Sequence, residues 1–235
     1  MKILFDNYNY NDKCKSLWGF SAYLEKYNLL FDTGSNGRVL LENIRELGVD
    51  VKKIKYLFIT HSHWDHIGGI DSILELNPNL TLFVPSSLSK HLIKDLKTLA
   101  KEVIICTKKA QKLFDNLYTT GLLGDEMPEQ SLIIDDEFPK VITGCGHFGI
   151  DNITKKAKSV ISKDIKFAIG GFHLLHSDNE KIQTTIDNLK NLGVEKVLPT
   201  HCTGDLAIKM FKYSFKNNAV DGGVGFSFNF IDAKD

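Results

Sequence analysis

The feature that most restricts the fold of this chain is the segment ITHSHWDHIGGI at residues 59–70. Three histidines and one aspartate (His61, His63, Asp65 and His66) directly follow IKYLFIT, a nearly all-apolar run that predicts a strand buried on both faces. In extended backbone, residues i and i+2 point to the same side, so His61 and His63 can bind one ion. Asp65 and His66 can bind a second ion. Imidazole nitrogen and carboxylate oxygen suit zinc, iron or manganese.

Two more histidines stand behind apolar runs. His147 ends VITGCGH and His201 ends VLPTH. A single histidine after an apolar run is more often a loop residue than a metal ligand. The alternative for all of these histidines together is that they are solvated loop residues clustered by chance. Both histidines occur in a chain that already carries the His-x-His-x-Asp-His pattern, and we therefore interpret them as further metal ligands.

Composition narrows the possible partners. Lysine plus arginine (29) balances aspartate plus glutamate (29), and only Arg38 and Arg45 are arginines, which argues against a nucleic-acid or membrane surface and disfavours a nuclease. No apolar run has the length of a signal peptide core or a membrane span. The four cysteines contain no Cys-x-x-Cys pair, so we expect a reduced, cytoplasmic protein. The oligomeric state is not indicated.

Strand and helix patterns alternate along the chain. Strands are predicted at residues 26–34, 54–60, 80–85, 131–136, 139–146, 165–172, 195–201 and 225–230. Helices are predicted at residues 38–49, 67–76, 87–100, 151–163, 179–194 and 205–215. No linker composition divides the chain, so we expect one α/β domain over residues 1–235, with ligands bound at strand-end loops.

Five motifs carry a family resemblance. FDTG, THSHWDHIGG, TGCGHFGI, GGFHLLH and PTHCTG follow one another in the order of the metallo-β-lactamase fold superfamily. The resemblance runs from Leu30 to GGVGFSFNF and implies a four-layer αββα sandwich with a binuclear metal site where two sheets meet. GCGHFGI, GGFHL and HCTG resemble a branch of metal-dependent hydrolase-like proteins. That branch includes an archaeal enzyme that joins a dihydropterin to a ribosylaminobenzene phosphate with loss of pyrophosphate.

The resemblance also implies a ligand set for two divalent ions, with zinc expected first and manganese or iron as alternatives. The first ion would be held by His61, His63 and His147. The second would be held by Asp65, His66 and His201. Asp32 in FDTG would support the ligand loop by hydrogen bonds, since a metal-bound imidazole needs a partner on its other nitrogen. A plain turn residue before Thr-Gly is an equally good interpretation of Asp32.

The sequence departs from the superfamily at one ligand position. Where most of its hydrolases carry a bridging aspartate, this chain has Gly171, followed by Phe172 and His173. Either His173 replaces the aspartate as a terminal ligand, or the second ion binds weakly and Asp65 orients the water at a one-metal site. His173 as a mere core or loop residue is the third interpretation. Asp65 and His173 are therefore the candidate catalytic residues, and a site with so little carboxylate favours an anionic substrate.

Other positions have two interpretations. In KSLWGFSAYLE, Leu17 and Trp18 replace a Glu-His pair of the pterin-linked branch, which argues against that specific activity. Trp18 and Phe20 would form either a wall for a planar ligand or packing beneath the loop. Cys145 and Cys202 would be buried fillers or soft groups near the metal, and neither is interpreted as a nucleophile. His91 and His176 are assigned to the surface. The loops 9–20 and 121–139 are expected to set specificity.

The function expected first is hydrolysis of a small anionic ester, phosphoester or lactone by a metal-activated water. A transferase that releases pyrophosphate is the alternative, and an iron-dependent redox enzyme ranks behind both. A non-catalytic metal-binding protein is the remaining class. Structural zinc sites are usually closed by cysteine-rich ligand sets, which these motifs lack.

Overall fold

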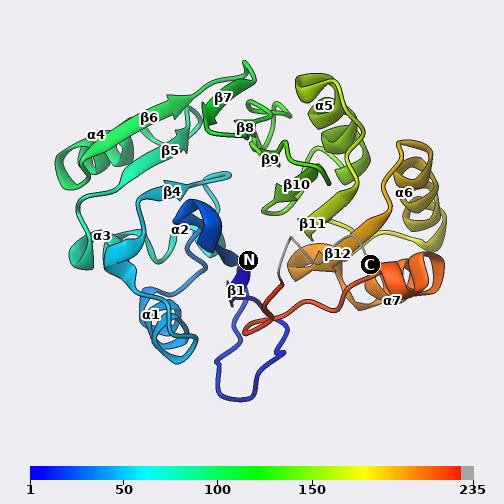
Figure 1. The fold of residues 1–235 in the computed structure, drawn as a ribbon, viewed down its shortest axis with the longest axis horizontal. Coiled ribbons are helices and arrows are strands. Elements are labelled where there is room, and N and C mark those ends of the chain that lie inside the picture. The colour runs from blue at the N-terminus through cyan, green and yellow to red at the C-terminus, as the bar shows by residue number, and fades with distance from the viewer. Residues whose placement is uncertain (229–235) are drawn as a thin grey trace. The chain divides into compact units, whose positions relative to one another are not determined.

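The computed structural model describes residues 1–228, and the chain divides into two compact units (Figure 1). The first unit comprises Met1–Cys106 and the segment that begins at Gly223. The second comprises Thr107–Gly222. Each unit contains a six-stranded mixed sheet with its own helices, which confirms the predicted α/β class. One domain over residues 1–235 stays a prediction.

The first sheet has the strand order β1-β2-β3-β4-β5-β6, with β1, β2 and β3 antiparallel neighbours and the later pairs parallel. Its strands are β1 (Lys2–Phe5), β2 (Ser21–Leu24), β3 (Leu29–Phe31), β4 (Tyr56–Phe58), β5 (Thr81–Pro85) and β6 (Glu102–Cys106). Its helices are α1 (Gly37–Glu46), α2 (Trp64–Ile67), α3 (Ile70–Leu76) and α4 (Lys90–Leu99), with short 3-10 turns η1 (Glu25–Tyr27) and η2 (Val51–Lys53).

This sheet is buried on both faces. Leu30, Leu57 and Leu82 belong to the core that includes the apolar sides of α1, α3 and α4. The alternate residues Phe31 and Phe58 are also fully buried, and their rings stack with centroids 5.5 Å apart. Burial of both faces explains why IKYLFIT is nearly all apolar instead of alternating.

The second sheet has the order β12-β11-β10-β9-β8-β7, in which β10, β11 and β12 are parallel and the remaining pairs antiparallel. Its strands are β7 (Gln111–Phe114), β8 (Leu117–Thr119), β9 (Leu132–Ile134), β10 (Lys140–Thr143), β11 (Phe167–Gly171) and β12 (Lys196–Thr200). Its helices are α5 (Ile150–Ile161), α6 (Asn179–Asn191) and α7 (Asp205–Phe215), with 3-10 turns η3 (His201–Thr203) and η4 (Lys216–Asn218). The apolar sides of these three helices pack on the sheet in one core.

Two predicted elements differ from the structure. The helix predicted over 67–76 begins only at Ile70, as α3, and Ile67 is the last residue of α2. The two glycines between them lie against other backbone: a Cβ on Gly68 would lie 2.4 Å from the Ser35 carbonyl oxygen, and one on Gly69 would lie 2.6 Å from that of Thr33. The strand predicted over 225–230 is wrong for residues 225–228, which form no regular strand: Ser227 makes an isolated bridge to Lys2, and backbone hydrogen bonds join the segment to Met1 and Ile3. Residues 229 and 230 lie outside the described residues.

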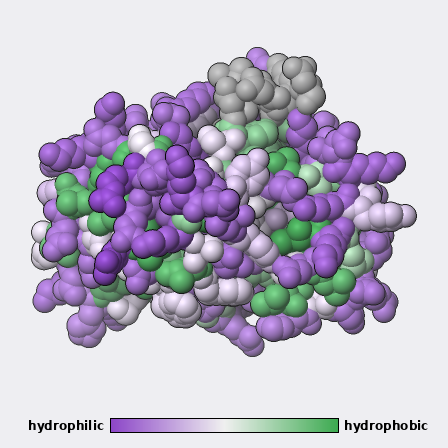
Figure 2. Space-filling view, turned by 90° about the horizontal axis from the view of Figure 1, so that it is seen from below, coloured by the Kyte–Doolittle hydropathy of each residue, from purple (hydrophilic) through white to green (hydrophobic). Residues whose placement is uncertain are grey.

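Within residues 1–228, no helix combines the length and apolar character needed to cross a membrane. The face drawn in Figure 2 is largely hydrophilic, and its apolar areas are small and separated. That pattern is ordinary for a protein surface on which single apolar side chains are scattered.

Candidate metal centre

The predicted site residues lie at the carboxyl ends of parallel strands, the usual ligand-binding edge of such sheets. In the first unit Asp32 follows β3, and the segment from Ile59 to His63 joins β4 to α2. In the second unit His147 lies on the loop after β10, His173 follows β11, and His201 follows β12. Each unit thus gathers its own set of polar side chains at one sheet edge.

A buried hydrogen-bond network holds the histidines of the first unit. Asp32 Oδ2 lies 2.7 Å from His66 Nδ1, and it also accepts from the Thr60 hydroxyl at 2.8 Å. Asp32 Oδ1 accepts from the Thr60 backbone N–H at 2.8 Å. The same Thr60 hydroxyl lies 2.8 Å from His61 Nδ1. Asp32, Thr60, His61 and His66 are all fully buried.

This network sets the tautomers of two imidazoles. The only hydroxyl proton of Thr60 is donated to Asp32, whose carboxylate is acceptor-only, so Thr60 Oγ1 must accept from His61 Nδ1–H. His66 Nδ1 likewise donates to Asp32. Both rings therefore keep Nε2 as the atom able to bind a metal, which is the arrangement that outer hydrogen bonds give to metal-binding histidines.

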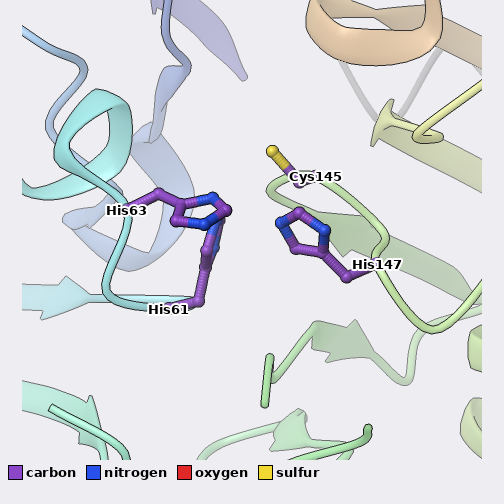
Figure 3. A group of neighbouring side chains, drawn as sticks. All are labelled: His61, His63, Cys145 and His147. Carbon is purple, nitrogen blue, oxygen red and sulfur yellow. The ribbon is translucent and has the colours of Figure 1, made fainter. Parts of the chain in front are cut away.

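The remaining candidate ligands of this unit lie close to the two oriented rings. The ring centroids of His61 and His63 are 4.7 Å apart (Figure 3), and the ring of His66 is 4.3 Å from that of His61. Asp65 Oδ2 lies 3.7 Å from His66 Nε2, and the Asp65 residue is 4% exposed. Ligand atoms of His61 and His63 lie within 4.8 Å of each other, as do those of Asp65 and His66. Such nitrogen and oxygen sets fit a divalent transition ion.

The ligand loop of the second unit is organised by one carboxylate. Glu129 is 2% exposed, and its Oε1 accepts from the Thr143 hydroxyl and from the backbone N–H groups of Gly144, Cys145 and Gly146 at 2.9–3.1 Å. Its Oε2 accepts from the backbone N–H of His147 at 2.9 Å. The carboxylate therefore fixes the backbone that carries His147, and five donors satisfy its buried charge.

Two thiols lie among the histidines of this unit. Cys145 Sγ is 3.5 Å from His201 Nε2, and the Cys202 thiol donates to the Cys145 carbonyl oxygen at 3.2 Å. Burial raises the pKa of the Cys202 thiol, but the hydrogen bonds with Cys145 and His173 outweigh it and bring that pKa well below its usual value. Both cysteines are buried, and Figure 3 shows Cys145 and His147 projecting from the same loop.

His173 has a different environment from the other candidate ligands. Its ring lies 4.3 Å from that of His147, and the hydrogen bond with Cys202 raises the pKa of His173. It belongs to none of the close groups of metal-binding atoms within residues 1–228. The structure thus places His173 beside a candidate ligand, and its role as a ligand or catalytic residue stays a prediction.

Backbone strain marks three of the predicted site residues. Asp32, His173 and His201 adopt positive φ values of 50°, 53° and 50°, a region that histidine rarely enters. Such strain persists only where surrounding contacts impose it, and it concentrates at functional positions. All three residues directly or nearly follow a strand end, where the chain must turn sharply to aim a side chain back at the sheet edge.

A cavity of about 220 Å³ opens beside His147 and His173 within the second unit. Its polar lining includes His147, His173, Asn152, Ser177, Lys181 and Thr185. Lys181 gives the cavity wall a positive charge, and no carboxylate among the described residues lines the cavity to balance it. The N-terminus of α5, where Gly149 provides no side-chain cap, is also part of the wall.

The structure shows the surroundings of the aromatic residues and of the two further histidines. Phe20 is fully buried against Phe31, with ring centroids 6.0 Å apart, so it packs beneath the loop. Trp18 is 39% exposed, and its loop approaches the ligand segment through the Phe20 N–H, which donates to the Asp65 carbonyl oxygen at 3.2 Å. His91 and His176 are exposed, which confirms their assignment to the surface.

Sequence reasoning missed Thr60 and Glu129. Thr60 had a usable signal, since a hydroxyl directly before the first ligand histidine can reach its ring. Glu129 had none, because it lies 14 to 18 residues from the groups it binds and follows no apolar run.

Comparisons with known proteins agree with this geometry. The profile of the Metallo-beta-lactamase superfamily matches residues 21–201. Over 91% of this chain and 90% of the relative, the sequence is 28% identical to 7,8-dihydropterin-6-methyl-4-(β-D-ribofuranosyl)-aminobenzene-5'-phosphate synthase of Methanocaldococcus jannaschii. An uncharacterized protein of that archaeon is 30% identical over 96% of this chain and 98% of its own.

A solved structure gives the same result. The crystal structure of Tm1679, described as a metal-dependent hydrolase of the β-lactamase superfamily, matches with a TM-score of 0.80 and 28% identity over 97% of each chain. The two mixed sheets and their helices match the fold that the five motifs predicted. The chain belongs to the metallo-β-lactamase superfamily, a superfamily of metal-dependent enzymes.

Proposed function

We propose that the chain is a metal-dependent hydrolase of a small anionic ester, phosphoester or lactone. The proposed ligands are His61, His63 and His147 for one divalent ion and Asp65, His66 and His201 for a second. The observation that carries the proposal is the Asp32–Thr60 network, which leaves Nε2 of both His61 and His66 ready to bind a metal. Zinc is the proposed ion, with manganese or iron as alternatives.

Bound divalent ions supply polarisation of the scissile bond and a water whose pKa is near neutrality. The chain supplies the proton acceptor and its placement. At a site with one metal, Asp65 is a buried carboxylate 3.7 Å from His66 Nε2 that can orient a water and take its proton. His173, which lines the cavity beside His147, can donate a proton to the leaving oxygen.

The cavity beside His147 supports an anionic substrate. Lys181 gives its wall a positive charge, and the hydroxyls of Ser177 and Thr185 provide further hydrogen-bonding groups. A phosphate or carboxylate meets no like charge there, because the lining contains no aspartate or glutamate in the described part of the chain. The proposal includes a small anionic substrate as partner, no nucleic acid or membrane partner, and a reduced cytoplasmic location.

A transferase that releases pyrophosphate is the second candidate. The relative of 28% identity is a synthase whose product carries an aminobenzene ring and a 5'-phosphate. Trp18 and Trp64 are 39% and 63% exposed, and both belong to segments next to Asp65 in the first unit. Exposed indole rings can stack on a planar ring. This observation favours a substrate with an aromatic portion.

Metal removal tests the proposal. Protein loaded with zinc is assayed on an aryl phosphoester, an aryl ester and a lactone, and then again after chelation. We expect chelation to lower the rate at least about 100-fold, because the bound water loses its activation. The circular dichroism spectrum should be retained, since a structural metal would cost the fold and a catalytic one should not.

The same experiment separates the alternatives. Pyrophosphate release from a dihydropterin pyrophosphate, with no hydrolysis of any ester, would favour the transferase. Unfolding on chelation, with no activity in the loaded protein, would favour a structural metal. Full activity in the chelated protein contradicts both enzymatic proposals.

Replacing Lys181 with alanine tests the anionic subsite. We expect KM for the phosphoester to rise about tenfold with little change in kcat, because one charge-assisted hydrogen bond to the substrate is lost. Lys155→Ala is the matched control, since Lys155 is an exposed lysine on α5 that does not line this cavity. An equal rise of KM for a neutral ester would show that Lys181 does not recognise the negative charge.

A further inference from the structure

The loop after β10 places a thiol between two of the candidate ligands. Cys145 Sγ lies 3.5 Å from His201 Nε2, and its distance to a ring nitrogen of His147 is within 4.8 Å. Cys145 is 4% exposed. His147 is proposed for one ion and His201 for the other, so this thiol is next to a ligand of each.

The position of Cys145 is tightly fixed. Its backbone N–H donates to Glu129 Oε1 at 2.9 Å, and its carbonyl oxygen accepts from the Cys202 thiol at 3.2 Å. Gly146 follows it with a φ of 74°, in the left-handed region that glycine adopts readily. The backbone that carries the thiol is therefore held by contacts that do not involve the sulfur.

The same loop occupies the space that a side chain at position 171 would need. A Cβ on Gly171 would lie 2.5 Å from the Gly144 carbonyl oxygen, 2.7 Å from Cys202 Sγ and 3.3 Å from Cys145 Cα. An aspartate at this position cannot fit without moving the loop. The side chain that comes closest to that place is Cys202, and Cys145 reaches it only with its Cα.

We infer that the Cys145 thiolate is a metal ligand shared by the two ions, in a chain whose position 171 has no room for a bridging carboxylate. The inference rests on the proposed metal-binding function. Thiolate sulfur is a strong ligand for zinc and iron, and it has lone pairs for two ions. When the ions bind, the thiol proton is released to solvent and each metal forms one bond to the sulfur. The thiolate also adds one negative charge to a ligand set in which Asp65 is the only carboxylate.

Cys202 does not compete for this role. Its thiol donates to the Cys145 carbonyl oxygen, and it belongs to none of the close groups of metal-binding atoms within residues 1–228. The alternative for Cys145 is a simple hydrogen bond to His201 that persists when metal is bound. The two alternatives differ in whether a metal–sulfur bond exists, and this can be measured directly.

The test is spectroscopic and uses the full chain. Protein is loaded with two equivalents of cobalt(II), and the near-ultraviolet sulfur-to-cobalt charge-transfer band is recorded for the natural sequence, Cys145→Ser, Cys202→Ser and Cys106→Ala. We expect the band in the natural sequence, its loss in Cys145→Ser only, and at least about a tenfold weaker metal affinity in that variant. X-ray absorption of the natural protein loaded with zinc should show sulfur at about 2.3 Å.

Each outcome bears on one statement. Two bound ions without a sulfur signal in the natural protein would overturn the inference and leave the proposed function intact. A signal lost in Cys202→Ser but kept in Cys145→Ser would overturn it too, because the ligand would then be Cys202. Failure of the natural protein to bind cobalt or zinc at all would instead remove the proposed function. The zinc measurement needs no variant and shows whether a metal–sulfur bond exists. If Cys145→Ser misfolds, Cys202→Ser identifies the ligand, because a sulfur signal kept in that variant excludes Cys202.

Discussion

Replacing Glu129 with alanine is expected to lower the free energy of unfolding by about 4 kcal/mol, the largest stability effect of any single change we propose. The carboxylate is buried and accepts from one hydroxyl and four backbone N–H groups. Removing it leaves those donors without their acceptor in a place that water reaches poorly. Buried donors that lose an acceptor cost their full desolvation free energy.

The variant Glu129→Gln keeps the shape of the side chain and removes its negative charge, so it tests the contribution of the charge alone. The amide oxygen can still accept from the N–H groups of Gly144, Cys145 and Gly146, but its NH₂ group would face the N–H of His147. We expect an intermediate loss of about 2 kcal/mol and a displaced His147. Weaker binding of the proposed ion at His147 should accompany it.

Urea unfolding followed by circular dichroism measures the stability loss, and chelator competition measures the metal affinity. Glu126→Gln is the matched control, because Glu126 lies on the same loop with an exposed side chain. It should change neither quantity. Equal stability of the alanine, glutamine and control variants would contradict the role assigned to Glu129.

The places of the candidate ligand histidines in the fold were predictable, because each follows an apolar run that ends at a sheet edge. His61, His147 and His201 all satisfy this rule, and the sequence places them without knowledge of the packing. The rule works because a strand buried on both faces must be apolar, so the first polar residues after it mark its carboxyl end. Local pattern alone is enough for this part of the site.

The groups that orient these histidines were predicted less well. Asp32 is 28 residues from Thr60 and 34 from His66, and only pairing of β3 with β4 brings them together. Glu129 similarly reaches the loop after β10 because β9 pairs with β10. Contacts between such distant residues depend on which strands become neighbours in the sheet, and the local pattern of each segment does not specify its partners.

Some predicted boundaries of strands were also wrong, because the local pattern does not show where the chain turns. The run IKYLFIT suggests seven strand residues, but β4 spans only Tyr56–Phe58, because the backbone turns after Ile59 to direct His61 and His63. Five strands were missed: β1, β2, β6, β7 and β8. For β6 and β7 the reason is their place at a sheet edge, where half-exposed side chains give no clear period, whereas β1, β2 and β8 are only three or four residues long. Function and edge exposure thus override the local pattern at identifiable positions.

Replacing Asp32 with asparagine is expected to weaken the binding of both proposed ions by about 100-fold, at the upper end of the effect of a changed hydrogen-bond partner. Asparagine tolerates the φ of 50° at this position, so the backbone should not change. The substitution removes one hydrogen-bond acceptor. In the natural protein Asp32 Oδ2 accepts from the Thr60 hydroxyl and from His66 Nδ1, whereas the NH₂ group of asparagine in its place can only donate.

The substitution should therefore reverse two tautomers at once. The Thr60 hydroxyl would accept from the introduced NH₂ group and donate to His61 Nδ1, which moves the His61 proton to Nε2. His66 Nδ1 would accept from the same NH₂ group, which moves its proton to Nε2 as well. Nitrogen-15 NMR of the imidazoles in metal-free protein reports these tautomers directly, and Asp71→Asn, an exposed aspartate in α3, is the matched control. Unchanged tautomers with unchanged metal affinity would show that Asp32 shapes the turn after β3 and does not direct the ligands.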